Sequence, residues 1–346
     1  MQQAGSPRRI TIVDVARHAQ VSTTTVSKVL RNAYGASPAM RAKVQEAIAE
    51  LGYRPNAAAR GMRGQTYTIG VILPDLRNPF FPDILDGLTD ALNDTPYQVL
   101  VGPGGHNDEQ AEVRGSDAMI DRGMDAMVLV APISPRSRLE HVARTVPTVV
   151  VGRHGHSDVY DTVSDDDFTG ATLVVEHLVK LGHRRIAHIE HAESDPARLI
   201  EMPNAIRADG YKHAMRTHDL ANEIDIVSTS YTQEGGYLGA RQILSRPELP
   251  TAIFAGADIV AMGVLAALTE AGLSVPDDIS LAGYDNTNFA ALGPISLTSV
   301  DQAGHHIGAE VARLLLSRIS DRDRPSTQVK LSPTLVTRRT TTPPAS

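Results

Sequence analysis

The stretch ITIVDVARHAQVSTTTVSKVL (residues 10–30) predicts two short helices joined by a tight turn. Thr11 can cap the first helix, which runs to Ala19 with its apolar side chains on one face. Ser22 can cap the second helix in the same way. Because only three residues separate the two helical patterns, the connection is typical of a helix-turn-helix. Taken alone, this pattern is only moderately specific, since many small helical cores share it.

A third helix is predicted over the stretch SPAMRAKVQEAIAEL (37–51). It starts with the favoured order of a capping Ser37 followed by Pro38, and Gly52 ends it. The three helical patterns together predict an α-helical head over residues 10–54.

The head is basic, whereas the rest of the chain is acidic. Residues 1–64 hold ten Lys and Arg residues against three Asp and Glu residues, a net charge of +7. The remaining 23 basic and 37 acidic residues give −14, so the whole chain carries −7. A basic segment on an acidic body indicates a polyanion-binding head, although an ordinary solvated surface has the same composition. Residues 1–9 are expected to form a flexible basic arm.

From about residue 67 the sequence alternates between short β-rich runs, starting with TIGVIL (68–73), and amphipathic helical runs. This alternation predicts an α/β body with parallel sheets and helices on both faces, and two similar series predict two lobes. The body is expected to cover 67–339, and the tail at 340–346 to be disordered. The expected lobe boundaries are about 67–164 and 300–326 for lobe 1, and about 165–297 and 327–339 for lobe 2.

Composition excludes several classes of protein and site. The chain has no Cys, so it has no disulfides and no thiolate metal sites. The sequence shows neither a signal peptide nor an apolar run of membrane-spanning length, so we expect a cytoplasmic protein without a membrane partner. The glycine-rich VGPGGH (101–106) lacks the spacing and the Lys of nucleotide-binding motifs, and no hydrolase motif is present. We expect no enzyme, no cofactor and no metal, and we interpret His154 and His156 as surface or capping residues.

The helix-turn-helix stretch and SPAMRAKVQEAIAELGYRPNAAAR (37–60) closely resemble the head of the lactose-repressor (LacI/GalR) family. The resemblance implies a sequence-specific DNA-binding transcriptional regulator whose second helix lies in the major groove of operator DNA. In the family, the residues at the positions of Thr23 and Thr24 vary with the operator sequence. Lys28 stands where Arg is usual, and as a single-point donor it is expected to read guanine less strictly.

The resemblance implies two groups of DNA contacts in the head. The first turn of the second helix faces the base edges and offers Ser22, Thr23, Thr24, Thr25 and Ser27. The family's phosphate contacts, which fix register rather than sequence, match Thr11, Ser22, Thr25, Ser37 and Asn56. Some of these hydroxyl groups have a second interpretation as helix caps only.

The segment PNAAARGMRG (55–64) resembles the family's hinge helix, so we expect a hinge helix and linker over 55–66. A helix this short is unstable alone and should fold only when two copies meet in the minor groove. Ala59 is small enough to lie against the groove. Met62 stands where the family inserts a Leu wedge. A homodimer is expected, because one head reads only half of a near-palindromic operator.

Three later stretches match landmarks of the family's body, which resembles periplasmic sugar-binding proteins that close two lobes over a ligand. They are LPDLRNPFFPDILDGL (73–88), GYDNT (283–287) and SLTSVDQAGHHIG (296–308). The effector contacts implied by position are Phe80, Phe81, Asp166, Phe168, Arg207, Asp285 and Gln302. Each type of residue also has a structural interpretation: an aromatic ring in the core, a helix cap, a surface arginine or a turn-forming acid.

Two departures from the family pattern concern this site. Asp167 replaces an Asn that usually follows the matched Asp166, and Ala257 replaces an Asn before Asp258. The loss of an amide at 257 suggests a smaller or differently hydroxylated ligand, and Asp258 has a second interpretation as a helix cap.

The function that follows is a repressor released from its operator by a small molecule, with a sugar or sugar derivative as the expected effector. An activator or a corepressor-dependent regulator fits the same scaffold. A sugar-binding receptor with a vestigial head, or an enzyme on a two-lobed body, is a more distant alternative.

Overall fold

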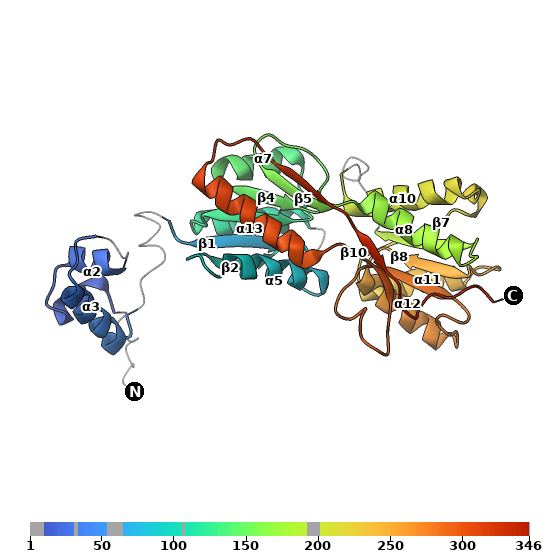
Figure 1. Cartoon of the computed structure of the whole chain (residues 1–346), viewed down its shortest axis with the longest axis horizontal. Helices are drawn as coiled ribbons and strands as arrows, with labels where there is room; N and C mark the ends of the chain where they lie inside the picture. The colour runs from blue at the N-terminus through green and yellow to red at the C-terminus, as the bar shows by residue number, and fades with distance from the viewer. Residues whose placement is uncertain (1–9, 31–33, 54–64, 106–107, 192–200, 346) are drawn as a thin grey trace, which may run out of the picture. The chain divides into compact units, whose positions relative to one another are not determined.

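The computed structural model divides the chain into two compact units, residues 1–66 and 67–346 (Figure 1). The residues that it describes are 10–30, 34–53, 65–105, 108–191 and 201–345. The predicted arm at 1–9 and the predicted hinge contacts Asn56, Ala59 and Met62 lie outside the described residues.

The first unit contains the three predicted helices, and each starts or ends at a signal that is local in the sequence. The Thr11 hydroxyl accepts from the Asp14 amide while the Asp14 carboxylate accepts from the Thr11 amide at 2.9 Å, which satisfies two backbone donors. Gly52 ends the third helix in the left-handed conformation. Apolar side chains from all three helices, among them Val26 and Val44, form one small core. The helices are α1 (Ile12–His18), α2 (Thr23–Leu30) and α3 (Pro38–Leu51).

Lobe 1 of the second unit is built on a six-stranded parallel sheet with the strand order β11-β5-β4-β3-β1-β2. Its strands are β1 (Thr68–Leu73), β2 (Gln98–Pro103), β3 (Ala126–Val130), β4 (Thr148–Val151), β5 (Asp161–Asp165) and β11 (Gln328–Leu331). Alternate side chains of β3 point to opposite faces of the sheet. Val128 packs with α5 (Phe80–Leu92) and α13 (Gly304–Ser320), and Met127 packs with α7 (Arg136–Thr145). One further helix of this lobe is α6 (Glu109–Asp121).

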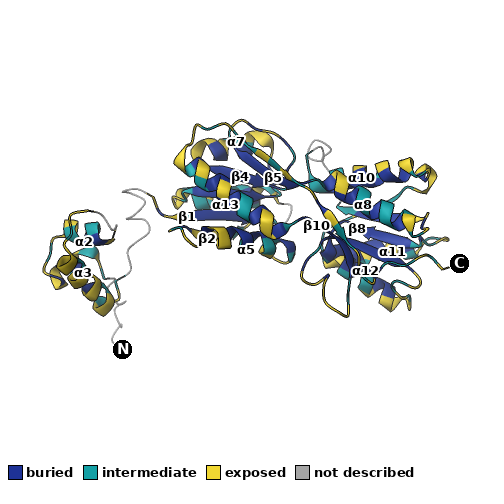
Figure 2. Cartoon of the chain, in the orientation of Figure 1, coloured by how far each residue is buried: buried dark blue, intermediate teal, exposed yellow. Residues whose placement is uncertain are grey.

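Lobe 2 has a second six-stranded sheet, with the order β12-β10-β9-β8-β6-β7, in which only β12 is antiparallel to its neighbour. Its strands are β6 (Ile186–His191), β7 (Asp225–Thr229), β8 (Ala252–Ala255), β9 (Ser280–Asp285), β10 (Thr298–Asp301) and β12 (Thr334–Val336). One face packs against α8 (Asp167–Lys180) and α10 (Pro203–Thr217), and the other against α11 (Gln233–Leu244) and α12 (Asp258–Glu270). The central strands β8, β9 and β10 are buried while the outer helix faces are exposed (Figure 2), as two-sided coverage of parallel sheets requires.

The chain passes between the lobes after β5, after β10 and after β11, and the last two crossings correct the expected boundaries. Val329 of β11 pairs with Val163 of β5, so residues 328–331 belong to lobe 1 and not to lobe 2. Residues 300 and 301, expected in lobe 1, lie in β10 of lobe 2. The physical reason is that α13 packs on lobe 1, and the strand after it completes the open edge of that sheet before the chain crosses back.

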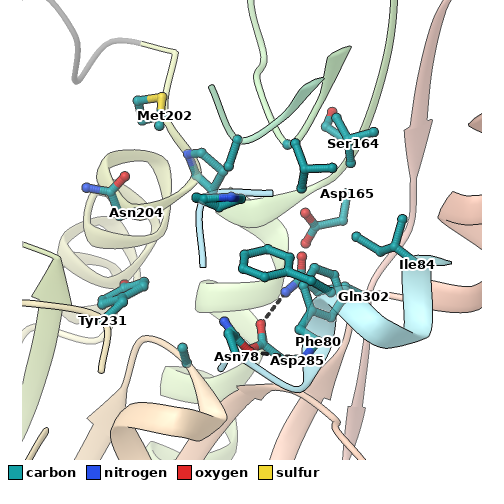
Figure 3. Close-up of a pocket in the computed structure, with 18 of the residues that line it drawn as sticks. Asn78, Phe80, Ile84, Ser164, Asp165, Met202, Asn204, Tyr231, Asp285 and Gln302 are labelled. Carbon is teal, nitrogen blue, oxygen red and sulfur yellow. Dashed lines mark hydrogen bonds between the residues drawn. The ribbon is translucent and has the colours of Figure 1, made fainter. Parts of the chain in front are cut away.

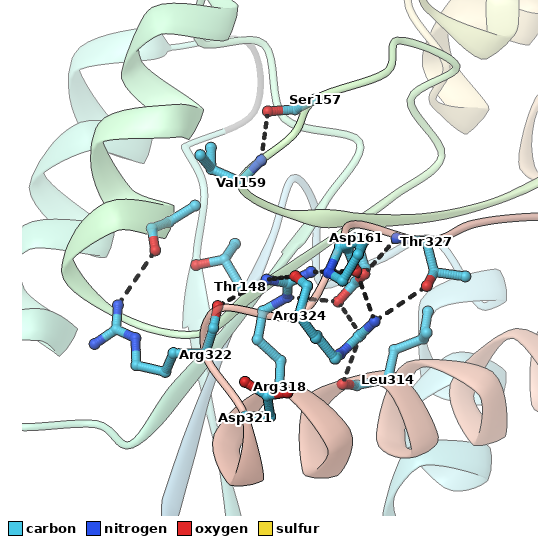
Figure 4. Close-up of polar contacts among 12 residues, drawn as sticks. Thr148, Ser157, Val159, Asp161, Leu314, Arg318, Asp321, Arg322, Arg324 and Thr327 are labelled. Carbon is cyan, nitrogen blue, oxygen red and sulfur yellow. Dashed lines mark hydrogen bonds and ion pairs between the residues drawn. The ribbon is translucent and has the colours of Figure 1, made fainter.

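A buried charge cluster fixes this return of the chain to lobe 1 (Figure 4). The Asp161 carboxylate, which is fully buried, accepts from Arg318 Nε at 2.8 Å and Nη2 at 3.0 Å. It also accepts from Arg324 Nη2 at 2.5 Å and from the Thr327 amide at 2.7 Å. Four donors therefore hold the end of α13 and the following turn against β5.

The expectation of a disordered tail is wrong for residues 340–342. The Leu281 amide donates to the Thr340 carbonyl at 2.7 Å, and the Thr342 amide donates to the Ser280 hydroxyl at 3.0 Å. The ring of His183 lies 2.8 Å from the Thr342 carbonyl. These hydrogen bonds hold the polar tail on β9, although it has no apolar pattern. Within the described ranges no helix is long and apolar enough to cross a membrane.

Candidate functional site

The first turn of α2 presents polar side chains to solvent. Thr23 and Thr24 are exposed, while Val26 and Val29 on the opposite side of the helix are buried. The Ser22 hydroxyl accepts from the Thr25 amide at 3.1 Å, so it caps the helix. A surface of short hydroxyl side chains on the first turn of a second helix has the shape and chemistry that the major groove admits.

The remaining candidate DNA contacts in the head differ in their burial and in their hydrogen bonds within the protein. Ser27 and Lys28 are half-buried on α2. Ser37 is exposed and caps α3 by accepting from the Met40 amide at 3.3 Å. The Thr11 hydroxyl accepts from the Asp14 amide at 3.4 Å, so Thr11 also caps α1, and it donates to the Asp14 carboxylate at 2.7 Å.

The second unit contains a cavity of about 160 Å³ between the two lobes, which we call the interlobe cavity (Figure 3). Lobe 1 contributes an apolar wall that includes Phe80, Phe81 and Ile84. Both lobes contribute polar groups, among them Asp165 of lobe 1 and Arg207 of lobe 2, and Gln302 lies on the crossing between β10 and α13. An apolar wall facing a few convergent polar groups is typical of small-molecule sites, although this cavity is smaller than the roughly 300 Å³ where such sites usually begin.

Five of the seven predicted effector contacts line the interlobe cavity, and two do not. Those that line it are Phe80, Phe81, Arg207, Asp285 and Gln302. Asp166 caps α8 through the Thr169 amide at 3.2 Å and pairs with Lys330 Nζ at 2.9 Å. Phe168 is exposed, with its ring centroid 5.2 Å from that of His213.

The acid that reaches the cavity is therefore Asp165 and not Asp166. Asp165 is the last residue of β5, whereas Asp166 is the N-cap of α8. A shift of one residue at a strand end turns the side chain in another direction, which explains the error in the prediction.

Arg207 is nearly completely buried and held on three sides. Its Nε donates to Asp167 Oδ1 at 2.5 Å and its Nη1 donates to the Gly256 carbonyl at 2.7 Å. Its guanidinium carbon lies 3.8 Å from the centroid of the Tyr284 ring. Burial alone would raise the pKa of Asp167, but Arg207 and then His154 lower it below its ordinary value. The Arg207–Asp167 pair is therefore ionised, and the interpretation of Arg207 as a surface residue is wrong.

Two carboxyl groups in the cavity, those of Asp165 and Asp285, have raised rather than lowered pKa values. Burial, followed by the neighbouring Asp167 carboxylate, raises the pKa of Asp165 to about 8. Its Oδ2 accepts from the Tyr284 hydroxyl at 2.8 Å. Burial also raises the pKa of Asp285 well above the usual range, against the effect of Arg207. In both acids burial therefore favours the protonated form, and the ionised partner of Arg207 is Asp167.

Asp285 also has unused hydrogen-bonding capacity. Its Oδ1 accepts from Gln302 Nε2 at 2.5 Å, but its buried Oδ2 has no partner among the described residues. The buried hydroxyl of Tyr231 is also without a partner there. Asp285 has a φ of 118°, a strained conformation that is rare outside glycine and concentrated at functional sites. A ligand hydroxyl can satisfy such orphaned groups, which are costly to bury unpaired.

Sequence reasoning missed several other residues of the cavity wall. They include Asn78, Asp165, His191, Asn204 and Tyr231. The sequence could have indicated Asn78 and Asp165, because each lies within two residues of a predicted contact. Tyr231 lies in the connection between β7 and α11, where no motif singles it out.

Asp258 has a structural role rather than a ligand-binding one. Its carboxylate accepts from the Thr287 amide at 2.8 Å and from the Ser299 hydroxyl at 2.6 Å. Burial raises its pKa to about 6. Ala257 lines the interlobe cavity with a methyl group in place of the amide found in the family.

Comparisons with known proteins cover both units of the chain. Residues 11–56 match the family model of bacterial regulatory proteins, lacI family, and residues 175–341 match the model of a periplasmic binding protein-like domain. The ribose operon repressor of Escherichia coli (strain K12) is 34% identical over 333 residues, which are 95% of this chain and 98% of that repressor.

Two solved structures are similar over nearly the whole chain. The lac repressor dimer bound to operator and the anti-inducer ONPF has a TM-score of 0.79 and 26% identity, over 97% of this chain and 100% of that chain. The transcriptional regulator CelR in complex with cellobiose has a TM-score of 0.70 and 27% identity, over 96% of this chain and 100% of that chain. These similar proteins are regulators and not enzymes, which confirms the predicted class. The chain therefore belongs to the lacI family of bacterial regulatory proteins.

Proposed function

We propose that this chain is a cytoplasmic, nucleoid-associated repressor of transcription that a small neutral polyhydroxylated effector, a sugar or close derivative, releases from its operator. The observation that carries the proposal is the interlobe cavity, in which Asp285 Oδ2 and the Tyr231 hydroxyl group, near Arg207, have no hydrogen-bond partner among the described residues. The similarity to a ribose operon repressor and to a cellobiose-bound regulator supports a sugar as the effector.

The proposed effector is neutral because the buried Arg207 already has a counter-ion within the protein. Arg207 Nε lies 2.5 Å from Asp167, and burial raises the pKa values of Asp165 and Asp285. Among the described residues that line the cavity, an anionic ligand would find no unpaired cation, and burying its charge would be costly. A sugar presents hydroxyl groups to the polar wall and C–H groups to Phe80 and Phe81.

The proposed mechanism couples this cavity to DNA binding in a homodimer. A ligand that contacts both lobes stabilises one arrangement of the lobes over another, in proportion to its differential affinity for them. That arrangement sets whether the two hinge segments meet in the minor groove, with a coupling typically of about 1–3 kcal/mol. An effector that disfavours this meeting releases a near-palindromic operator. The opposite sign gives a corepressor, and operator position decides between repression and activation.

The proposed DNA contacts combine the exposed first turn of α2 with positions that the resemblance to the family implies. Thr23 and Thr24 read base edges from its exposed first turn, together with Ser27 and Lys28. The backbone contacts are Thr11, Ser22, Thr25, Ser37 and Asn56, and the minor-groove contacts are Ala59 and Met62.

A thermal-shift screen of the full-length protein against neutral sugars, sugar phosphates, nucleosides and purines tests the effector. A ligand that binds only the folded state raises the unfolding midpoint by mass action. We expect a neutral sugar to raise the midpoint and to release fluorescent operator DNA in an anisotropy assay. A response confined to phosphates or purines would contradict the proposed chemistry. A sugar that tightens operator binding would instead identify a corepressor.

A further inference from the structure

The connection between β4 and β5, residues 152–160, belongs to lobe 1 but contacts lobe 2 through charged side chains. Arg153 Nε donates to Glu201 Oε2 at 2.9 Å, and the His154 amide donates to the Glu201 carbonyl at 3.0 Å. His154 Nε2 lies 2.6 Å from Asp167 Oδ2. Two consecutive residues of one lobe therefore contact the other lobe beside the interlobe cavity.

Both residues are also fixed to their own lobe. Arg153 Nη1 donates to the Ser134 carbonyl at 2.6 Å. The His154 carbonyl accepts from Gln328 Nε2 of β11 at 3.3 Å. The His154 side chain is 15% exposed and the Asp167 side chain is completely buried. The contact is therefore a built junction between the lobes rather than a chance surface pair.

Asp167 divides its two oxygens between His154 and the cavity. Its Oδ2 faces His154, and its Oδ1 accepts from Arg207 Nε at 2.5 Å. The side chains of His154 in lobe 1 and of Asp167 and Arg207 in lobe 2 thus form a continuous series that ends at the interlobe cavity. Members of one buried charged network are energetically coupled, so moving the first is expected to affect the last.

We propose that His154 is a positioning residue for effector binding, which orients the guanidinium of Arg207 through Asp167 and does so only while the lobes are close together. This inference rests on the proposed function, in which the interlobe cavity is the effector site. In this arrangement the geometry of the binding site depends on lobe closure, although His154 itself does not contact the ligand. It also replaces the interpretation of His154 as a surface or capping residue.

The neighbouring His156 provides a matched control on the same connection. Its side chain is 60% exposed and its Nε2 lies 3.3 Å from Asp158, which is itself exposed. A metal site does not explain the pair, since no group of three potential ligands occurs in the described part of the chain.

The test measures Arg207 directly, in the ligand-free full-length protein. The Nε–H signal of Arg207 is assigned by its loss in Arg207→Lys. The exchange rate of this guanidinium proton with solvent is then measured in NMR spectra. Because this proton is buried and donated to a carboxylate, we expect it to be protected. In His154→Leu we expect its exchange to become about tenfold faster, while His156→Leu leaves it unchanged.

His154→Gln serves as the conservative variant, because its amide retains an N–H donor for Asp167. We expect His154→Gln to restore most of the protection of the Arg207 Nε–H proton. If His154 acted through packing alone, the donor group would not matter and Gln would not be expected to restore it. An unchanged Arg207 signal in His154→Leu, or equal effects of His154→Leu and His156→Leu, would overturn the positioning role. Because no effector is used, failure of the sugar screen would refute the proposed function while leaving this measurement decisive for His154.

Discussion

Replacing Arg207 with Met removes the cation that neutralises Asp167 while keeping an unbranched apolar side chain on α10. In the native protein the Arg207 Nε and Asp167 Oδ1 atoms are 2.5 Å apart, and the two side chains are 7% and 0% exposed. Breaking a buried pair leaves an uncompensated charge and costs about 3–5 kcal/mol. We expect Arg207→Met to lose that amount of unfolding free energy at neutral pH, measured by urea titration.

The pH dependence of this loss has a definite sign. Arg207 lowers the folded-state pKa of Asp167, so the pair contributes stability above the unfolded pKa of about 3.9 that is lost as pH falls through the folded value. Without Arg207, the pKa of Asp167 rises because burial then dominates. The deficit of Arg207→Met is therefore largest at neutral pH and shrinks towards pH 4.

Two further variants make the experiment decisive. Arg207→Met combined with Asp167→Asn removes both charges, and we expect it to regain at least half of the lost free energy. Lys212→Met, on the same helix, breaks the more exposed contact between Lys212 Nζ and Asp209 at 3.2 Å, and should cost less than about 1 kcal/mol. A loss below about 1 kcal/mol in Arg207→Met, or a double variant no more stable than the single one, would refute the buried-pair reasoning.

Three other predictions concern separate parts of the chain. Arg318→Met deprives the fully buried Asp161 of two donors and should cost about 3 kcal/mol in urea unfolding, and a neutral effect would contradict the proposed anchoring of α13. The pKa of Asp165 is raised to about 8, so the folded protein binds this proton more tightly than the unfolded chain does. The resulting stability is present at low pH and is lost as pH rises from about 4 to 8. Asp165→Asn should therefore flatten the stability profile over that interval, and an unchanged slope would refute the shift. Met62→Gly should weaken operator binding far more than binding to random DNA in anisotropy titrations, whereas equal losses would argue against a wedge.

The head was predictable because its signals are local. The capping contacts of Thr11 and Ser37 each join residues three positions apart, and Gly52 acts through its own backbone conformation. A pattern that short can be read directly from the order of residues. The strand–helix alternation of the body is local in the same sense, which is why two sheets with helices on both faces were expected.

The errors arose where a segment is fixed by partners far away in the sequence. Strand β11 joins lobe 1 through pairing with β5 and through the Arg318–Asp161 contact, which joins residues 157 positions apart. The tail at 340–342 is held by hydrogen bonds to β9. Neither segment carries a hydrophobic period that identifies its neighbour, so composition alone favoured the wrong lobe and a disordered end.

In the candidate site, too, the residues that could be predicted are those identified by the sequence immediately around them. Arg207, Asp285 and Gln302 were found by position within recognisable stretches, and they do line the interlobe cavity. Asp165 was missed by one residue because the end of β5 and the start of α8 fall between adjacent acids. His154 was missed because its significance depends on Asp167, a partner in the other lobe.

The substitution of Asp for the family's usual Asn at position 167 connects these observations to ligand choice. Burial raises the pKa values of Asp165 and Asp285, whereas Asp167 is the ionised neighbour of the buried Arg207. A buried guanidinium without such a neighbour gains most from an anionic ligand. With Asp167 at 2.5 Å that need is already met within the protein. The same carboxylate also contacts His154, so in the proposed mechanism Asp167 both favours a neutral effector and makes its binding sensitive to lobe closure.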